Sequence, residues 1–402
     1  MKEKYIELII NKCIDLKRSK VVFISYNKEI KPFIELFCNK LKNMNIKDIY
    51  LDEVDEYYKH DLLKKLSTEE IKKEKYFDCS IWDEYAKKNA NFIMFETEMP
   101  NLYDDIESEK IKEVMNIRIN TKPLYRKLQE ECKLLWTIVA YPGELWAKDI
   151  YNEENSYKLL EESIYKMCML DKKDPLKEWD NFVENQIKKV QILNKLNIEK
   201  LHYENSLGTD LYVYLPDKYK YESALDNGIM VNMPSYEIFT SPIYNKTEGI
   251  VYSTKPLIYN GGVIDEFYLK FKNGKVVSYD AKKGKELLKI ILEMDEYSSY
   301  LGEAALVEYD SPISKMNINF KTTLIDENAS CHLALGAGFR ECIEDGINLN
   351  DLELKEKGIN ISKTHVDFMI GNKDLKITAY THEGEIIPIF ENGNFSKNTF
   401  YI

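Results

Sequence analysis

The chain lacks the features that would direct it to a membrane or to nucleic acid. No uninterrupted apolar run approaches the roughly 18 to 20 residues of a membrane span, and the N-terminus is amphipathic, without the short apolar core of a secretory signal. Acidic residues outnumber basic ones, 68 to 56, which leaves a formal net charge of -12. We therefore expect a cytoplasmic protein that binds neither a membrane nor nucleic acid.

Cysteine and glycine patterns exclude two further classes. The seven cysteines are an odd number, widely dispersed, and no two have the Cys-x-x-Cys spacing of a thiolate zinc site. We expect them to be small buried side chains in a reducing compartment, although Cys331 adjoins His332. The glycine fingerprint of a dinucleotide-binding fold is also missing after the first predicted strand, so nucleotide binding is not expected.

What the chain does have is apolar material for two packed cores. Its length of 402 residues exceeds the size at which a single core stops growing, and 44% of its residues are hydrophobic. In the first half, apolar runs at 21–26, 46–51, 91–96 and 134–140 alternate with segments of helical period. This alternation predicts a mostly parallel sheet covered by helices on both faces. A charged helical stretch follows at about 158–196, with a break at Asp174-Pro175.

The pattern changes beyond residue 196. Short β-rich runs occur at 210–215, 255–259, 263–271 and 275–279, and Asn-Gly sequences at 260–262 and 273–274 predict hairpin turns. Helical stretches are expected at about 285–294 and after His332. We therefore predict an α/β N-terminal domain, residues 1–196, and an α+β C-terminal domain rich in antiparallel strands, residues 197–402.

Two of the five histidines lie among spaced carboxylates in the C-terminal third. His365 and Asp367 are two residues apart in a β-rich segment, so on a strand both side chains leave the same face. Glu327 and His332 are separated by small residues, which suits a strand-to-helix turn that points both into one cavity. Glu237 follows a Pro-Ser pair closely and is expected at a strand edge or bend.

These side chains have the composition of a metal site. Imidazole and carboxylate without thiolate favour zinc, manganese or cobalt over a closed structural zinc site. Two divalent cations would neutralise the four carboxylates of the group, whereas one would leave buried excess charge. The four are Glu237, Glu303, Glu327 and Asp367. Each member alone also fits a structural role, and Glu303, after a glycine, resembles the start of a solvated helix. The remaining histidines are expected to be surface or core residues: His60, His202 and His382.

Four segments resemble, in order and spacing, the thermophilic metalloaminopeptidases of the aminopeptidase T, aminopeptidase S and peptidase S type. The segments are residues 232–242, 302–313, 327–336 and 360–371, and residues 140–147 resemble a further family segment in the N-terminal half. The resemblance implies a cytosolic exopeptidase that hydrolyses N-terminal residues from peptides. It also implies two divalent metal ions, zinc, cobalt, manganese or magnesium, that activate a water.

The resemblance further implies the role of each residue. The metal ligands would be the residues at the matching positions: Glu237, Glu303, Glu327, His332, His365 and Asp367. Glu303 is the first choice for the catalytic proton acceptor, although it equally fits a bridging ligand. The implied partners are peptides with a free N-terminus and a second copy of the chain, in a homodimer that encloses the site. The C-terminal domain would be catalytic, and the N-terminal domain would cover it or form dimer contacts.

One position departs from the family. Members carry a tyrosine seven residues after the histidine of the third segment, and here that position is Phe339. A phenol donates a hydrogen bond to a developing oxyanion and a phenyl ring does not, and losing one such donor typically costs about 100-fold to 1000-fold in turnover. Either activity is slower or altered in specificity, or Arg340, Tyr236 or Tyr380 supplies the donor. A metal- or peptide-binding homologue with weak or lost catalysis is the alternative hypothesis. A dinuclear phosphatase is a third hypothesis, but it would need more histidines and more basic groups to bind phosphate than these segments contain.

Overall fold

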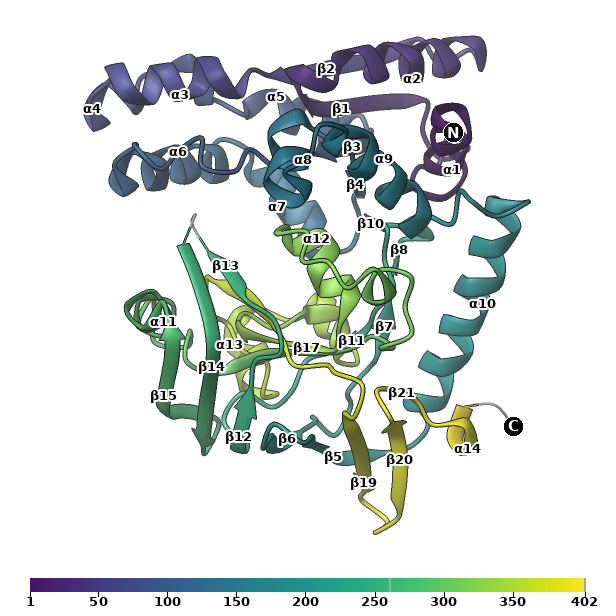
Figure 1. Cartoon of the computed structure of the whole chain (residues 1–402), viewed down its shortest axis with the longest axis vertical. Coiled ribbons are helices and arrows are strands. Elements are labelled where there is room, and N and C mark those ends of the chain that lie inside the picture. Colours follow the sequence, from purple (N-terminus) through teal and green to yellow (C-terminus); the bar gives the residue numbers. More distant parts are fainter. Residues whose placement is uncertain (260–261, 401–402) are drawn as a thin grey trace. The chain divides into compact units, whose positions relative to one another are not determined.

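The computed structural model describes residues 1–259 and 262–400 (Figure 1). By contacts the chain forms two compact units. One consists of Met1–Trp179 with Leu225–Pro234, and the other of Asp180–Ala224 with Ser235–Ile402. The predicted domain division between residues 196 and 197 stays a prediction. Within the described ranges, no helix has both the length and the apolar character needed to cross a membrane.

The first unit contains the predicted parallel sheet. Its strands are β1 (Val21–Asn27), β2 (Asp48–Val54), β3 (Asn91–Glu96), β4 (Leu135–Ala140) and β10 (Asn232–Met233). They lie in the order β10-β4-β3-β1-β2, and every neighbouring pair is parallel. The four strands expected in the first half are therefore present. The fifth, β10, is a two-residue segment from much later in the chain, too short for a periodicity to reveal it.

Helices cover both faces of this sheet, as its continuous apolar strands require. They are α1 (Lys2–Lys12), α2 (Lys31–Asn43), α3 (Glu56–Lys65), α4 (Thr68–Ile71), α5 (Ser80–Lys87), α6 (Ser108–Asn120), α7 (Pro123–Glu130), α8 (Glu144–Tyr151) and α9 (Ser156–Met167). Phe92 and Phe95 point to opposite faces of β3 because they are an odd number of residues apart. Phe92 packs against Trp82 of α5, and Phe95 packs against Phe33 of α2.

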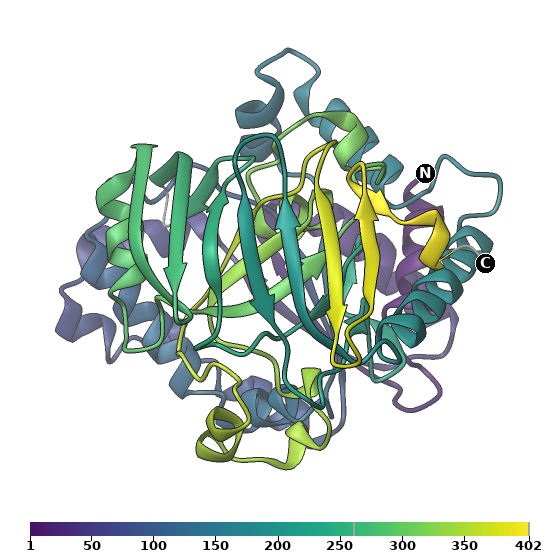
Figure 2. The ribbon, with the colours of Figure 1, turned by 90° about the horizontal axis from the view of Figure 1, so that it is seen from below.

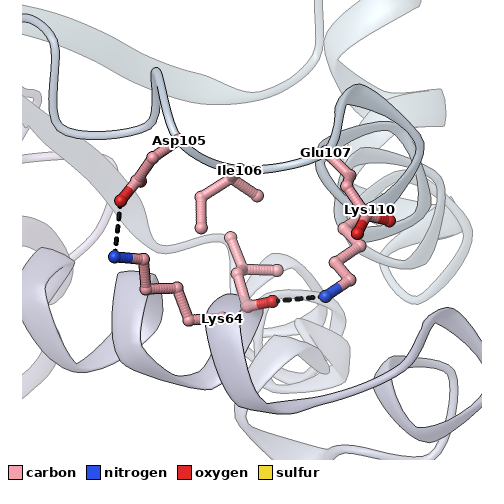
Figure 3. A pocket seen from close by; sticks show the side chains of 6 residues that line it. Lys64, Asp105, Ile106, Glu107 and Lys110 are labelled. Atoms are coloured by element: carbon pink, nitrogen blue, oxygen red, sulfur yellow. Dashed lines mark hydrogen bonds and ion pairs between the residues drawn. The ribbon is translucent and has the colours of Figure 1, made fainter.

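A small hollow lies beside α3 and α6 in this unit (Figure 3). Its lining includes two lysines, and both are already engaged. Lys64 Nζ lies 2.5 Å from Asp105, and Lys110 Nζ donates to the carbonyl oxygen of Leu63 at 2.9 Å. We therefore assign both lysines a structural role: Lys64 holds α3 to the loop before α6, and Lys110 holds α6 to α3.

The second unit is built on two antiparallel sheets, which confirms the predicted class. The larger has the order β13-β14-β12-β6-β5-β19-β20-β21, with β15 paired to β14, and Figure 2 shows it face on. Its strands are β5 (Ile198–Glu204), β6 (Asp210–Tyr214), β12 (Glu248–Tyr252), β13 (Leu257–Tyr259), β14 (Gly262–Lys272), β15 (Lys275–Lys283), β19 (Lys376–Thr381), β20 (Ile386–Glu391) and β21 (Asn394–Phe395). The predicted turn at 273–274 joins β14 to β15. Of the turn predicted at 260–262, residues 260 and 261 lie outside the described residues.

The smaller sheet has the order β18-β17-β16-β11-β7. Its strands are β7 (Glu222–Ser223), β11 (Ile238–Thr240), β16 (Leu301–Leu306), β17 (His332–Gly336) and β18 (His365–Met369). The helices of the second half are α10 (Pro175–Leu193), α11 (Lys285–Leu292), α12 (Thr323–Asp326), α13 (Asp351–Glu356) and α14 (Lys397–Phe400). The predicted helix break at Asp174-Pro175 is confirmed, since α9 ends before it and α10 begins at the proline.

The turn around Glu327 runs in the opposite direction to the prediction. A 3-10 helix, Glu327–Ala329, precedes β17, so the chain passes from helix to strand, and it continues after His332 as a strand rather than as a helix. The next α-helix begins only at Asp351. Residues 332–336 include leucine and alanine, which favour helices, but pairing with a strand on each side overrides that preference.

Candidate metal centre

Two histidines and two acids lie on one face of the smaller antiparallel sheet, β18-β17-β16-β11-β7. Opposite residues of an antiparallel pair share a face, and so do residues two apart along one strand. Ala334 lies opposite both Glu303 and Asp367. His332 precedes Ala334 by two residues, and His365 precedes Asp367 by two. The side chains of these four predicted ligands therefore share this face, which we call the ligand face.

The opposite face of the same strands is part of the apolar core that is shared with the nine-stranded sheet. The alternate residues enter it: Ile238, Ala304, Leu306, Leu333, Leu335, Val366 and Phe368. Glu303 directly precedes the core residue Ala304 in β16 and is buried. The structural alternative for Glu303, a solvated helix start, is therefore wrong.

The potential ligand atoms form two overlapping groups. One oxygen or nitrogen each from Glu237, Glu303 and His332 lie within 4.8 Å of one another, and the same holds for Glu303, His365 and Asp367. Glu303 belongs to both groups. Its carboxylate lies 3.1 Å from His365 Nε2 and 3.9 Å from His332 Nε2. The carboxylate of Glu303 therefore lies near both imidazoles and connects the two groups.

Backbone carbonyls orient both imidazoles. His332 Nδ1 lies 3.1 Å from the carbonyl oxygen of Ser330, and His365 Nδ1 lies 2.8 Å from that of Ala337. A carbonyl oxygen only accepts hydrogen bonds, so Nδ1 of each ring carries the hydrogen when the ring is neutral. Nε2 then turns a lone pair toward the carboxylates. Partners of this kind orient metal-ligating histidines in general, so the donor set fits a divalent cation that prefers nitrogen and oxygen ligands.

One buried amide connects the segments of the other two glutamates. Asn328 is fully buried, and its Oδ1 accepts the backbone N–H of Tyr236 at 2.6 Å. Its Nδ2 donates to the carbonyl oxygen of Leu324 at 3.0 Å and lies 3.4 Å from Glu327 Oε1. Because Tyr236 directly precedes Glu237, this side chain sets the spacing of two predicted ligands. Sequence reasoning missed it, since a lone asparagine carries no recognisable signal.

Burial and crowding raise the pKa values of two carboxyl groups. Burial raises the pKa of Glu303 to about 7. Burial, followed by the charges of Glu237 and Asp367, raises the pKa of Glu327 well above its usual value. Glu327 lies outside the two groups of ligand atoms, although it interacts electrostatically with members of both. The acids of the ligand face therefore repel one another strongly enough to favour bound positive charge.

The pKa values of the two imidazoles are also raised, which favours the charged form of these rings. Burial opposes a charge on His332, yet the carboxylates of Glu237 and Glu303 raise its pKa to about 10. Burial likewise opposes a charge on Asp367, but His365 lowers the pKa of this acid to about 2. Protons on the imidazoles thus balance part of the negative charge. A cation that binds at Nε2 has to displace them.

Phe339 also stands beside the ligand face. Its ring centroid lies 5.0 Å from that of His365 and 5.1 Å from that of Phe239. The residues expected to replace the missing phenol are engaged elsewhere. The Arg340 guanidinium binds Asp351 and a backbone carbonyl, and Tyr380 lies on β19 of the other sheet.

Tyr236, the third residue expected to replace that phenol, packs its ring against Phe182 of α10 at 5.1 Å. The histidines predicted to be structural each pair with an aspartate: His60 with Asp105, His202 with Asp210 and His382 with Asp217. None of the three belongs to the two groups of ligand atoms found among the described residues.

Comparisons with known proteins agree over nearly the whole chain. Residues 1–395 match the family described as "Thermophilic metalloprotease (M29)". Aminopeptidase AmpS of Bacillus subtilis (strain 168) is 36% identical over 405 residues, covering 98% of this chain and 97% of that protein. Aminopeptidase 2 of Geobacillus stearothermophilus is 31% identical with the same coverage. The solved structure of wild-type AmpT from Thermus thermophilus has a TM-score of 0.89 at 26% identity, covering 98% of both chains.

We predict that replacing Asn328 by alanine weakens metal binding. The variant frees the backbone N–H of Tyr236 and loosens the spacing of Glu237 and Glu327, so the affinity for zinc should fall by about 10-fold to 100-fold. Competition titration with a chromophoric chelator measures this. Asn194→Ala is the control, because Asn194 also bonds one residue's backbone at two points, on Tyr221, away from the ligand face. Equal zinc affinity in the two variants would contradict the role of Asn328.

Metal binding should release protons and strengthen as pH rises. The carboxylates raise the pKa of His332 and His365, so both imidazoles stay protonated at neutral pH until a cation displaces the protons. For each proton displaced, the metal affinity should rise about tenfold per pH unit below the raised pKa values. Isothermal titration calorimetry in buffers of different ionisation enthalpy counts the protons. Binding heats that do not depend on the buffer would exclude this linkage.

Proposed function

Since this chain belongs to the thermophilic metalloprotease family and is an aminopeptidase, we propose that it hydrolyses N-terminal residues from peptides with two divalent cations bound at the ligand face. The observation that carries the proposal is the place of Glu303 in both groups of ligand atoms. A site for one cation would use only one of these groups. The histidine and the unshared carboxylate of the other group would then have no role.

The residues present fit such a pair of cations. Glu237 and His332 would hold one cation, His365 and Asp367 the other, and Glu303 would lie between them. Bound there, zinc, cobalt, manganese or magnesium would polarise the scissile carbonyl and lower the pKa of a water toward neutrality. The backbone carbonyls behind the imidazoles keep Nε2 directed at the site throughout. Glu327, which lies outside the two groups, would complete the predicted ligand set.

Two carboxylates are candidates for carrying the proton from water to the leaving amine. Glu303 is the first, because its buried carboxylate lies at the centre of the site, 3.1 Å from His365 Nε2 and 3.9 Å from His332 Nε2. Its central position also suits a bridging ligand, which would occupy both oxygens. Glu327 is the second candidate, because it lies outside the two groups of ligand atoms, and one of its carboxylate oxygens lies 3.4 Å from Asn328 Nδ2.

The remaining parts of the proposal rest on the family. The α-amino group of the peptide would bind a cation or a carboxylate, which confines cleavage to free N-termini. Residues 197–402 would form the catalytic domain. The chain would act in the cytoplasm as a homodimer that encloses the site, and residues 1–196 would cover the catalytic domain or form dimer contacts.

Purified protein should hydrolyse aminoacyl-p-nitroanilides in a metal-dependent way. Chelation should abolish release of nitroaniline, and adding back zinc, cobalt, manganese or magnesium should restore it. An N-acetylated aminoacyl-p-nitroanilide is the control and should remain intact, since it has no free amino group. Cleavage of the acetylated substrate would rule out an exopeptidase. If no metal restores hydrolysis although metal binds stoichiometrically, the alternative hypothesis of a binding homologue without catalysis is favoured.

Glutamine at positions 303 and 327 separates proton transfer from metal binding. If Glu303 is the proton acceptor, Glu303→Gln should lower kcat by about 100-fold to 10,000-fold while two metals per chain remain bound. If Glu303 bridges the cations, the same variant should lose metal, and Glu327→Gln should show the kcat defect instead. Metal content by atomic emission and kcat on the same samples decide between them. Full activity in both variants would exclude both glutamates.

Phe339→Tyr should raise turnover. The neighbours expected to supply a phenol's hydrogen bond are engaged elsewhere, so a hydroxyl at this position would restore a missing donor beside His365. The gain in kcat should reach as much as about 100-fold to 1000-fold with little change in metal content. Phe239→Tyr is the matched control, because it adds a hydroxyl to the neighbouring ring. A gain of equal size in the control would show that the position of the hydroxyl does not matter.

A further inference from the structure

Two phenylalanines, Phe239 and Phe339, lie beside the predicted metal ligands and have not been given a role in metal binding. Phe239 lies opposite Ala305 in the β11–β16 pair, and Ala305 is two residues from Glu303. The ring of Phe239 therefore emerges on the same face as the acids, with Glu237 two residues before it. Both Phe239 and Phe339 are partly exposed, and neither belongs to the core shared by the two sheets.

The backbone fixes the position of Phe339. Gly336 has a φ of 101°, a conformation that other residues rarely adopt, and it turns the chain back over β16. The approach is close, because a Cβ atom on Gly302 would lie 2.1 Å from the carbonyl oxygen of Ala337. The N–H of Phe339 then donates to Ser241 Oγ at 2.8 Å. The ring is thereby held at the site and does not depend on a flexible loop.

The two rings stand on the open side of the ligand face. Their planes meet at 64° with centroids 5.1 Å apart, an edge-to-face pair. Side-chain exposure rises from 1% at His332 to 27% at His365, and Phe339 contacts the more exposed histidine. A molecule that reaches the ligand atoms from solvent therefore approaches beside these rings.

We propose that Phe239 and Phe339 form an aromatic wall that contacts the side chain of the substrate's N-terminal residue and selects large apolar side chains over small and acidic ones. The inference rests on the proposed function. In an aminopeptidase the α-carbon of this residue lies between the amino group and the scissile carbonyl, which both engage the site. Its side chain must therefore project from beside the ligands, where Phe339 is in contact with His365.

Physical chemistry sets the direction of this selection. An apolar side chain removes its own surface and that of two partly exposed rings from water, which favours binding. An acidic side chain would lose hydration against the rings without gaining a hydrogen-bond partner there. Apolar contacts of one side chain commonly discriminate by about 10-fold to 200-fold. This is the range expected for leucyl over alanyl substrates.

Ratios of kcat/KM test the wall in the metal-loaded protein. Leucyl- and phenylalanyl-p-nitroanilide should be cleaved at least about tenfold more efficiently than the alanyl compound, and the glutamyl compound least. Phe239→Ala and Phe339→Ala should bring the leucyl/alanyl ratio close to one, and Phe239→Leu should keep it high. The ratio does not depend on the fraction of folded protein. Tyr268→Ala, which removes a partly exposed aromatic from the other sheet, should leave it unchanged.

A binding measurement separates this inference from the proposed function. L-leucinol and L-alaninol carry the amino group and side chain but cannot be hydrolysed. Calorimetry on the metal-loaded protein should show L-leucinol bound at least about tenfold more tightly, and Phe239→Ala should remove the difference. If this difference in binding is found but no substrate is hydrolysed, the proposal of an aromatic wall stands and the proposed catalysis is refuted. Equal binding of the two, an unchanged leucyl/alanyl ratio in both alanine variants, or preferred cleavage of lysyl or glutamyl substrates would overturn the wall.

Discussion

Repulsion among buried carboxylates is the constraint on which the rest of the C-terminal unit depends. Three acids and two imidazoles gather at one region of a sheet whose other face is core, so the strands cannot turn away from the charge without exposing apolar residues. The charge has to be balanced in place, by protons on the histidines or by cations. Backbone carbonyls and a buried amide direct the balancing atoms and leave little freedom for the cluster to relax. Order at the site therefore comes from the sheet and the charge together.

Sequence reasoning succeeded where a pattern is local. The parallel strands of the first half are long apolar runs, and helix α2 buries the periodic residues that predicted it, including Phe33 and Phe37. The pair His365 and Asp367 follows from the two-residue period of a strand alone. The antiparallel character of the second half was readable from short strands and an Asn-Gly turn at 273–274. Local period and turn chemistry were sufficient in each case.

What the sequence could not reveal depends on partners far away in the chain. The direction of the turn before His332 is decided by pairing with β16 and β18, not by residues 327–336 themselves. Asn328 acquires its role only because Tyr236 is folded against it. The separation of Glu327 from the two ligand groups, and the central place of Glu303, are likewise properties of the register. A family resemblance supplies the identities of such residues, but the distances between their atoms are needed to assign a chemical role to each.

The contribution of β10 to the first sheet bears on how this protein is made. Residues 232 and 233 pair with β4, although the strands of the rest of that sheet end at residue 140. During synthesis the ribosome therefore has to complete the start of the second unit before the first can close its sheet. Until then one edge of β4 carries unpaired backbone groups, the kind of edge that invites association with other nascent chains. The two compact units are consequently interleaved along the gene, because residues 225–234 of the first follow residues 180–224 of the second.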